Sequence, residues 1–180
     1  EPGPLGVYGA SKLAGERAAL AAQPRTIVLR TAWVCSADGQ NFVRTMLRLA
    51  REGRHTVGVV ADQFGAPTFA GDLAGAVVAL LPWMVQTPAD DPRFGVFHLT
   101  GVPHASWHAF AAEIFAGIRA RGESAPTLTP ITTADYPTRA IRPADGRLDC
   151  RRIATVHQVA PADWRVSLSA CLDQLVGPRR

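Results

Sequence analysis

Two residues near the start of the chain have types and spacing that suit acid–base chemistry. Lys12 is the only lysine in the 180-residue sequence, and Tyr8, four positions earlier, is one of two tyrosines. On a helix this spacing places both side chains on one face. An ammonium group favours the ionised form of a nearby phenol, and a positioned acid with a pKa near the working pH can protonate a carbonyl oxygen during its reduction. We interpret Tyr8 and Lys12 as a candidate acid–base pair; two surface residues on an ordinary helix are the alternative.

A helix and the strand that follows it would position this pair. The alanine-rich segment 7–22 predicts a helix with Tyr8 and Lys12 in its first turns. Segment 26–30 is a β-branched run typical of a buried parallel strand. Because ligands bind at the carboxyl ends of strands in open α/β sheets, Trp33 just after this strand is a candidate for stacking on a ligand. Packing of Trp33 into the core is the alternative.

The rest of the sequence alternates between helix and strand patterns. Helices are expected over 41–52, 70–83, 107–120, near 151 and over 166–175, and strands over 56–60, 95–99 and 127–131. Asn41 and Ser106 are suited to cap the first and third of these helices. The loop 61–68 carries Gln63 and Thr68, for which a role in ligand binding and the polarity of a solvated loop are open alternatives. Strands that alternate with helices are typical of βαβ units, so we expect an α/β fold with a parallel sheet.

Composition and charge argue against several classes of protein. The formal net charge is +4, but the arginines are scattered among acids, so no nucleic-acid partner is expected. The three cysteines form neither a disulfide framework nor a zinc spacing, which indicates a reducing compartment. His104 and His108 have the spacing of metal ligands on a helix but lack a third ligand, so no metal is predicted. No cleavable signal or long apolar run is visible, and we expect a cytoplasmic protein with no membrane partner.

Several short blocks along the chain resemble one enzyme superfamily. Tyr8-x-x-x-Lys12 is followed by Leu-Ala-Gly-Glu and then by Arg30-Thr31-Ala32-Trp33-Val34. The later blocks are Asn41-Phe42-Val43, Thr45–Ala50, Asp62–Thr68, Tyr136-Pro137-Thr138, Arg142-Pro143 and Arg147-Leu148-Asp149. In order and approximate spacing, these blocks resemble the extended short-chain dehydrogenase/reductase superfamily and, within it, the dTDP-4-dehydrorhamnose reductases. The resemblance covers nearly the whole chain.

The resemblance implies an activity for the intact protein. It implies the NADPH- or NADH-dependent reduction of the C4 keto group of dTDP-4-dehydro-L-rhamnose to dTDP-L-rhamnose. Tyr8 would donate the proton and Lys12 would bind the nicotinamide ribose, so both are implied as catalytic and cofactor-binding residues. The residues implied to bind the dTDP-sugar are Trp33, Gln63, Thr68 and Arg142.

The sequence lacks the glycine-rich turn with which dinucleotide-binding folds hold a pyrophosphate. In the family that this chain resembles, that turn and most of the nucleotide-binding sheet precede the Tyr-x-x-x-Lys helix. We therefore expect residues 1–180 to be a C-terminal fragment that is inactive alone and mixes the last part of a Rossmann domain with the substrate-binding part. The expected fold is a partial Rossmann-like, doubly wound parallel sheet without its N-terminal nucleotide-binding half, with a small C-terminal substrate-binding α/β portion.

Departures from the family leave some assignments open. Cys35 stands where an aromatic residue commonly follows the Trp-Val pair, and the loop 142–146 lacks the Asn-Ser that relatives often carry before Arg-Leu. Acidic residues that bind a dimer-bridging metal in some relatives have no clear match, so a homodimer remains an open expectation. Two alternative functions are another nucleotide-sugar epimerase or dehydratase of the same superfamily, and a non-catalytic subunit resembling the regulatory subunit of methionine adenosyltransferase.

Overall fold

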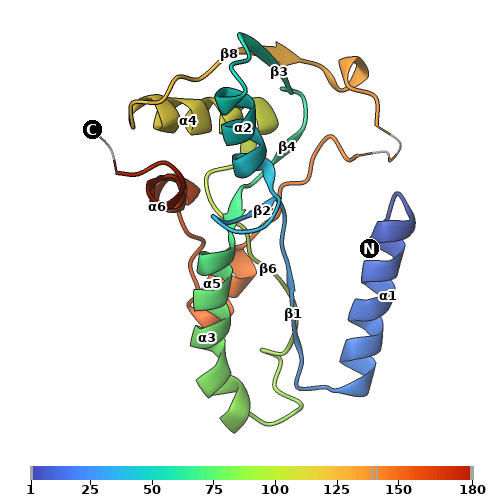
Figure 1. Ribbon diagram of the computed structural model, residues 1–180. Coiled ribbons are helices and arrows are strands. Elements are labelled where there is room, and N and C mark those ends of the chain that lie inside the picture. The colour runs from blue at the N-terminus through green and yellow to red at the C-terminus, as the bar shows by residue number, and fades with distance from the viewer. Residues whose placement is uncertain (1, 139, 141, 179–180) are drawn as a thin grey trace.

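The computed structural model describes residues 2–138, 140 and 142–178 and has a mixed α/β architecture (Figure 1). Its helices are α1 (Val7–Ala22), α2 (Phe42–Arg51), α3 (Ala70–Gln86), α4 (Trp107–Arg119), the short η1 (Thr133–Asp135), α5 (Arg151–His157) and α6 (Trp164–Leu175). Its strands are β1 (Ile27–Arg30), β2 (Val34–Cys35), β3 (Thr56–Val60), β4 (Phe64–Gly65), β5 (Thr68–Phe69), β6 (Gly95–His98), β7 (Ala105–Ser106) and β8 (Thr127–Ile131). In this part of the chain, no helix combines the length and apolar character needed to cross a membrane.

The strands of the described residues pair into four two-stranded sheets. β1 pairs with β6, β2 with β5, and β3 with β8 in parallel, whereas β4 and β7 pair antiparallel. At least one helix lies between the two strands of each parallel pair, which provides the crossover that parallel pairing requires. The α/β class and the parallel pairing predicted from the sequence are thus confirmed.

Two hydrophobic cores hold these elements together. The larger core lies among α2, α4, α6 and β3, and its centre is formed by the fully buried Phe110, Ile114 and Ile118 of α4. The smaller core joins α3 and α5 to the β1/β6 pair through the buried Phe97 and Ile153. Burying each such side chain contributes about 1.5–3 kcal/mol. In Figure 1 the helices and strands of the larger core lie above and those of the smaller core below, with β2 between them.

Most predicted elements are confirmed, with bounds that agree within three residues. The predicted caps are present, because Asn41 accepts a hydrogen bond from the Arg44 N–H and Ser106 accepts one from the Ala109 N–H. Helix α3 differs, since it continues through Pro82 to Gln86. A proline inside a helix removes one backbone hydrogen bond. Here Trp83 packs on Phe94 and His157, and this packing stabilises the turn beyond the proline.

Helix α1 stands apart from both cores and lies alongside β1 at the edge of the molecule (Figure 1). None of its residues is buried, and its half-buried residues Gly9, Leu13, Glu16 and Leu20 fall on one face. In the described part of the chain, β1 has β6 as its only strand partner. One edge of β1 and most of the surface of α1 are therefore open to solvent.

A buried arginine ties the end of α4 to α6. The Arg121 side chain is fully shielded from solvent and lies 2.6 Å from the carboxylate of Asp173, which is half exposed. The guanidinium also donates to the backbone carbonyls of Gly117 and Ser169, at 2.9 and 2.8 Å. A buried charge is tolerated when it is paired and hydrogen-bonded in this way.

Asp173→Ala is expected to lower the free energy of unfolding by about 3 kcal/mol, because it leaves a buried guanidinium without its counter-ion. The double variant Arg121→Met/Asp173→Ala is expected to recover most of that loss, since a buried methionine needs no counter-ion. Urea unfolding followed by circular dichroism measures both effects. Equal losses in the single and double variants would contradict this account and show that the hydrogen bonds of Arg121 to the backbone dominate.

Candidate active site

Tyr8 and Lys12 lie one turn apart on the same face of α1, as their spacing predicts. The Lys12 ammonium nitrogen Nζ is 5.4 Å from the centre of the Tyr8 ring, which is within cation–π range. The Tyr8 side chain is 77% exposed, and the Ser11 hydroxyl next to it donates to the Tyr8 carbonyl at 2.8 Å. The Ser11 hydroxyl therefore has its hydrogen-bond partner within the helix, whereas the Tyr8 phenol and the Lys12 ammonium are accessible to a ligand.

Trp33 lies in the turn between β1 and β2. Its φ of 48° falls in the left-handed region, which is uncommon for a residue with a bulky side chain. Its indole stacks on Trp107, the first residue of α4, with ring centres 3.6 Å apart and planes 15° from parallel. Gly65 approaches the same indole so closely that a side chain at that position would collide with it. Trp33 therefore packs on the protein itself, and its contact with a ligand remains a prediction.

Gln63 and Thr68 are buried, so the sequence-based view of a solvated loop is wrong. The Gln63 amide nitrogen Nε2 donates to the Thr133 hydroxyl at 3.1 Å. The Thr68 hydroxyl donates to the Ala66 carbonyl and accepts from the Gly101 N–H, both at 3.2 Å. Buried polar groups need such partners, and here they connect the segment around β4 and β5 to distant loops. A role of either residue in substrate binding remains a prediction.

Arg142 is exposed in the loop between η1 and α5. The start of this long connection is fixed by Asp62, which accepts hydrogen bonds from the Thr133 N–H at 2.9 Å and from its hydroxyl at 2.8 Å. These bonds lower the pKa of Asp62 below its ordinary value. Arg142 is far from Tyr8 and Lys12 in the sequence. The hydrogen bonds between Asp62 and Thr133 hold the start of its loop in place.

A hollow of about 550 Å³ lies beside the loop that leads into α5, and sequence reasoning assigned none of its residues to a site. Arg147 and Arg151 on its lining form ion pairs with Asp145 and Asp149. Hydrogen bonds from the arginines lower the pKa of each carboxyl to about 2. The repeated Asp-x-Arg spacing is the signal that could have indicated this cluster. Because the charges are paired, the hollow does not present a clear anion site.

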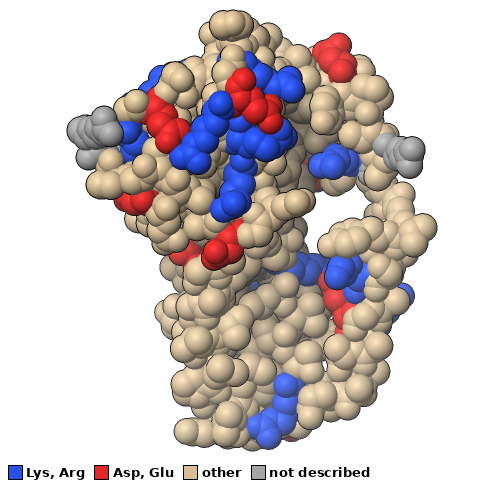
Figure 2. Space-filling model, viewed as in Figure 1, with Lys and Arg blue, Asp and Glu red and all other residues tan. Residues whose placement is uncertain are grey.

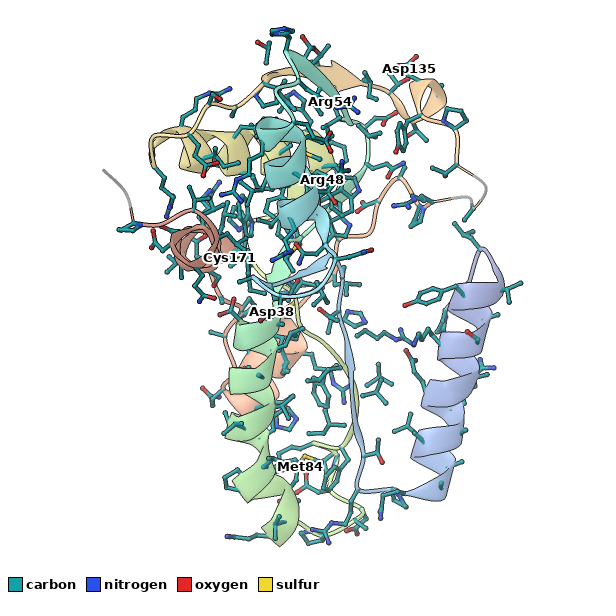
Figure 3. The ribbon with its side chains drawn as sticks, viewed as in Figure 1. Asp38, Arg48, Arg54, Met84, Asp135 and Cys171 are labelled. Atoms are coloured by element: carbon teal, nitrogen blue, oxygen red, sulfur yellow. The ribbon has the colours of Figure 1, made fainter. Side chains whose placement is uncertain are left out.

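Charges of both signs gather over α2 on the face drawn in Figure 2. Arg48 pairs with Glu52 and Arg51 pairs with Glu123. Arg48 and Arg54 can be followed in Figure 3, where both lie at this end of the molecule. The interspersed acids agree with the scattered charge noted in the sequence.

His104 and His108 do not share a helix. His104 is exposed ahead of α4, whereas His108 lies inside α4 with a buried Nε2 that has no hydrogen-bond partner. In the ranges that the structure describes, no three His, Cys, Asp or Glu side chains gather as metal ligands.

A sequence model of the RmlD substrate binding domain matches residues 1–176. The chain belongs to this family. A member from Aggregatibacter actinomycetemcomitans, named dTDP-4-dehydrorhamnose reductase, is 44% identical over 167 residues, which make up 92% of this chain and 56% of that protein. The resemblance to dTDP-4-dehydrorhamnose reductases is thereby confirmed.

Solved structures carry the same RmlD fold. The crystal structure of a dTDP-4-dehydrorhamnose reductase from Clostridium acetobutylicum superposes with a TM-score of 0.85 at 34% identity, covering 97% of this chain and 57% of that one. The enzyme from Bacillus anthracis, solved in complex with NADP, superposes with a TM-score of 0.85 at 28% identity and with the same coverage. This chain therefore spans a little over half the length of these RmlD relatives.

Proposed function

We propose that these residues form the C-terminal portion of a dTDP-4-dehydrorhamnose reductase, which reduces the C4 keto group of dTDP-4-dehydro-L-rhamnose with NADPH or NADH. The observation that carries the proposal is the exposed Tyr8–Lys12 pair, with Nζ 5.4 Å from the phenol ring, in a chain of the RmlD family. In the proposed division, α1, β1 and β6 belong to the Rossmann part. The larger core around α4 belongs to the part that binds the sugar nucleotide.

The proposed mechanism assigns one step to each member of the pair. A nicotinamide cofactor supplies the hydride when it is bound. Tyr8 donates its phenolic proton to the C4 carbonyl oxygen as that oxygen gains negative charge. Lys12 binds the nicotinamide ribose, and its positive charge stabilises the phenolate that remains on Tyr8 after proton transfer. The accessibility of both side chains on α1 is compatible with these contacts.

Trp33, Gln63, Thr68 and Arg142 are the proposed substrate-binding residues. Arg142 is exposed, and its planar guanidinium suits the diphosphate of the nucleotide. Gln63 and Thr68 are buried, and we propose that they shape the substrate-binding site by holding the loop 61–68, which is bonded to the Trp33 carbonyl through the Thr68 N–H. Trp33 presents the part of its indole that Trp107 and Gly65 leave free.

Trp33→Ala in the intact protein is expected to weaken binding of the dTDP-sugar by about 1–3 kcal/mol, because a stacking surface is lost. NADPH affinity is expected to change little, since the cofactor contacts proposed for this chain lie on α1 and not at Trp33. Calorimetric titration with each ligand measures the difference. Equal weakening of both ligands, or loss of the folded state, would assign Trp33 to packing alone.

Assay of the intact protein tests the proposal directly. Turnover of dTDP-4-dehydro-L-rhamnose with NADPH or NADH, without turnover of an epimerase substrate such as a UDP-sugar, is the expected result. Copurification with a methionine adenosyltransferase, with no sugar turnover, would favour the regulatory-subunit alternative.

We propose a reducing, cytoplasmic location, because all three cysteines are free and buried. We also propose that the protein has no nucleic-acid partner. Size-exclusion chromatography of the same sample tests for a homodimer.

A further inference from the structure

The face of α1 that carries Tyr8 and Lys12 also carries the carboxylate of Glu16. Tyr8, Lys12 and Glu16 follow one another at intervals of four residues, so their side chains lie along one side of the helix. The Glu16 side chain is 17% exposed, in contrast to the exposed Tyr8 and Lys12. Of these three side chains, Glu16 is therefore the one that contacts the rest of the protein.

Its partner is Arg30, the last residue of β1. Arg30 Nε donates to Glu16 Oε1 at 2.9 Å and Arg30 Nη2 donates to Oε2 at 2.6 Å, which is a bidentate, fork-like pair. These hydrogen bonds lower the pKa of Glu16 and raise that of Arg30, and the nearby His98 also lowers the Glu16 pKa. Both groups are therefore held in their charged forms. Figure 3 shows side chains of α1 and β1 extending toward one another between the two ribbons.

Among the described residues, few other contacts fix the rotation of α1. In the described part of the chain, no residue of α1 is buried, and this ion pair is the one side-chain hydrogen-bonded link between α1 and a strand. Leu13 and Leu20 are half-buried, but contacts of that kind permit sliding and rotation more easily than two parallel hydrogen bonds do. Arg30, in turn, is held by the register of β1 with β6, where it lies opposite His98.

We propose that Glu16 and Arg30 are positioning residues that set the rotation of α1 about its axis and so aim Tyr8 and Lys12 at the substrate. The inference rests on the proposed reductase function. The pair also joins α1 to β1, the strand that leads directly to Trp33. Tyr8 and the proposed substrate-binding residue Trp33 are therefore both positioned relative to β1. Reacting groups must be held within about 0.5 Å and 10–20° of their productive geometry, and helix rotation alters both quantities.

Hydrogen exchange in the intact protein tests the anchoring step without any assay of activity. In Glu16→Gln, the amides of α1 are expected to exchange at least about tenfold faster than in the unaltered protein, because a local opening that breaks the pair becomes easier. The amides of the buried helix α4 serve as an internal reference and are expected to keep their rates. Unchanged exchange in α1 would overturn the inference.

Kinetics of the same variants test the positioning step. A misplacement on the order of 1 Å costs about 10²-fold in rate, so kcat is expected to fall by about 10–100-fold in Glu16→Gln. The KM for the dTDP-sugar is expected to stay within about threefold, because the groups that bind the sugar are not on α1. The charge-swapped variant Glu16→Arg/Arg30→Glu is expected to recover part of the loss.

The matched control is Glu52→Gln, which removes an exposed carboxylate from the Arg48–Glu52 pair on α2 and is expected to change neither α1 exchange nor kcat. Equal losses in Glu52→Gln and Glu16→Gln would overturn the inference, as would an unchanged kcat in Glu16→Gln. If the unaltered protein reduced no sugar, the proposed function would fail, while hydrogen exchange would still decide whether the pair anchors α1.

Discussion

Replacing Tyr8 with phenylalanine in the intact protein is expected to lower kcat by about 10²-fold or more, the usual scale for removal of a positioned general acid. The phenol lies beside the Lys12 ammonium on an exposed helix face, and phenylalanine keeps the ring while removing the only proton that the side chain can give. Substrate affinity is expected to change little, because the hydroxyl matters most when charge develops on the carbonyl oxygen.

Steady-state kinetics and a binding titration on the same preparation separate these two effects. Tyr136→Phe is a matched control, since it removes the hydroxyl of the other tyrosine, which is also exposed and lies in the loop after η1. A loss smaller than a few-fold in Tyr8→Phe, or an equal loss in Tyr136→Phe, would remove Tyr8 from the proposed chemistry.

The 180-residue chain alone is expected to bind NADPH no more tightly than about millimolar and to reduce no sugar. Pyrophosphate binding relies on backbone N–H groups at a helix N-terminus beside a glycine turn, and the sequence has no such glycine-rich turn. Tyr8 and Lys12 supply only contacts to the nicotinamide end. The open edge of β1 is also expected to promote self-association, because unpaired strand edges pair with other chains.

Fluorescence titration with NADPH and size-exclusion chromatography of the purified chain measure both properties. The intact protein, assayed in parallel, controls for the quality of the cofactor and substrate. A monodisperse monomer that binds NADPH at micromolar concentration would contradict the expectation that residues 1–180 are an incomplete reductase.

The long elements of the fold were predictable because each has a local signal. Helix α4 has a cap at Ser106 and an apolar stripe, and β3 has a β-branched run, so neither needs distant information to be recognised. The strands β2, β4, β5 and β7 were missed. Each contains two residues, too few to show any periodicity, and each exists because a distant segment lies beside it.

The candidate site was only partly predictable for the same reason. The Tyr8–Lys12 spacing is local and lies on one helix, so the sequence predicts their adjacency correctly. The burial of Gln63 and Thr68 depends on partners far along the chain, Thr133 and Gly101, and no local pattern indicates it. The stack of Trp33 on Trp107 likewise brings together two segments that the sequence does not connect.

The parallel pairing of the strands also affects the order in which the chain assembles. The register places Ile27 opposite Gly95 and Thr56 opposite Thr127, so both longer pairs join segments that are far apart in sequence. Pairing of this kind requires closure of a long loop, and the entropy cost of closure comes before any stabilising strand contact forms. This makes strand pairing slow compared with helix formation. During synthesis β1 emerges before β6, so we expect this pair to close only after the segments of α2 and α3 have been made.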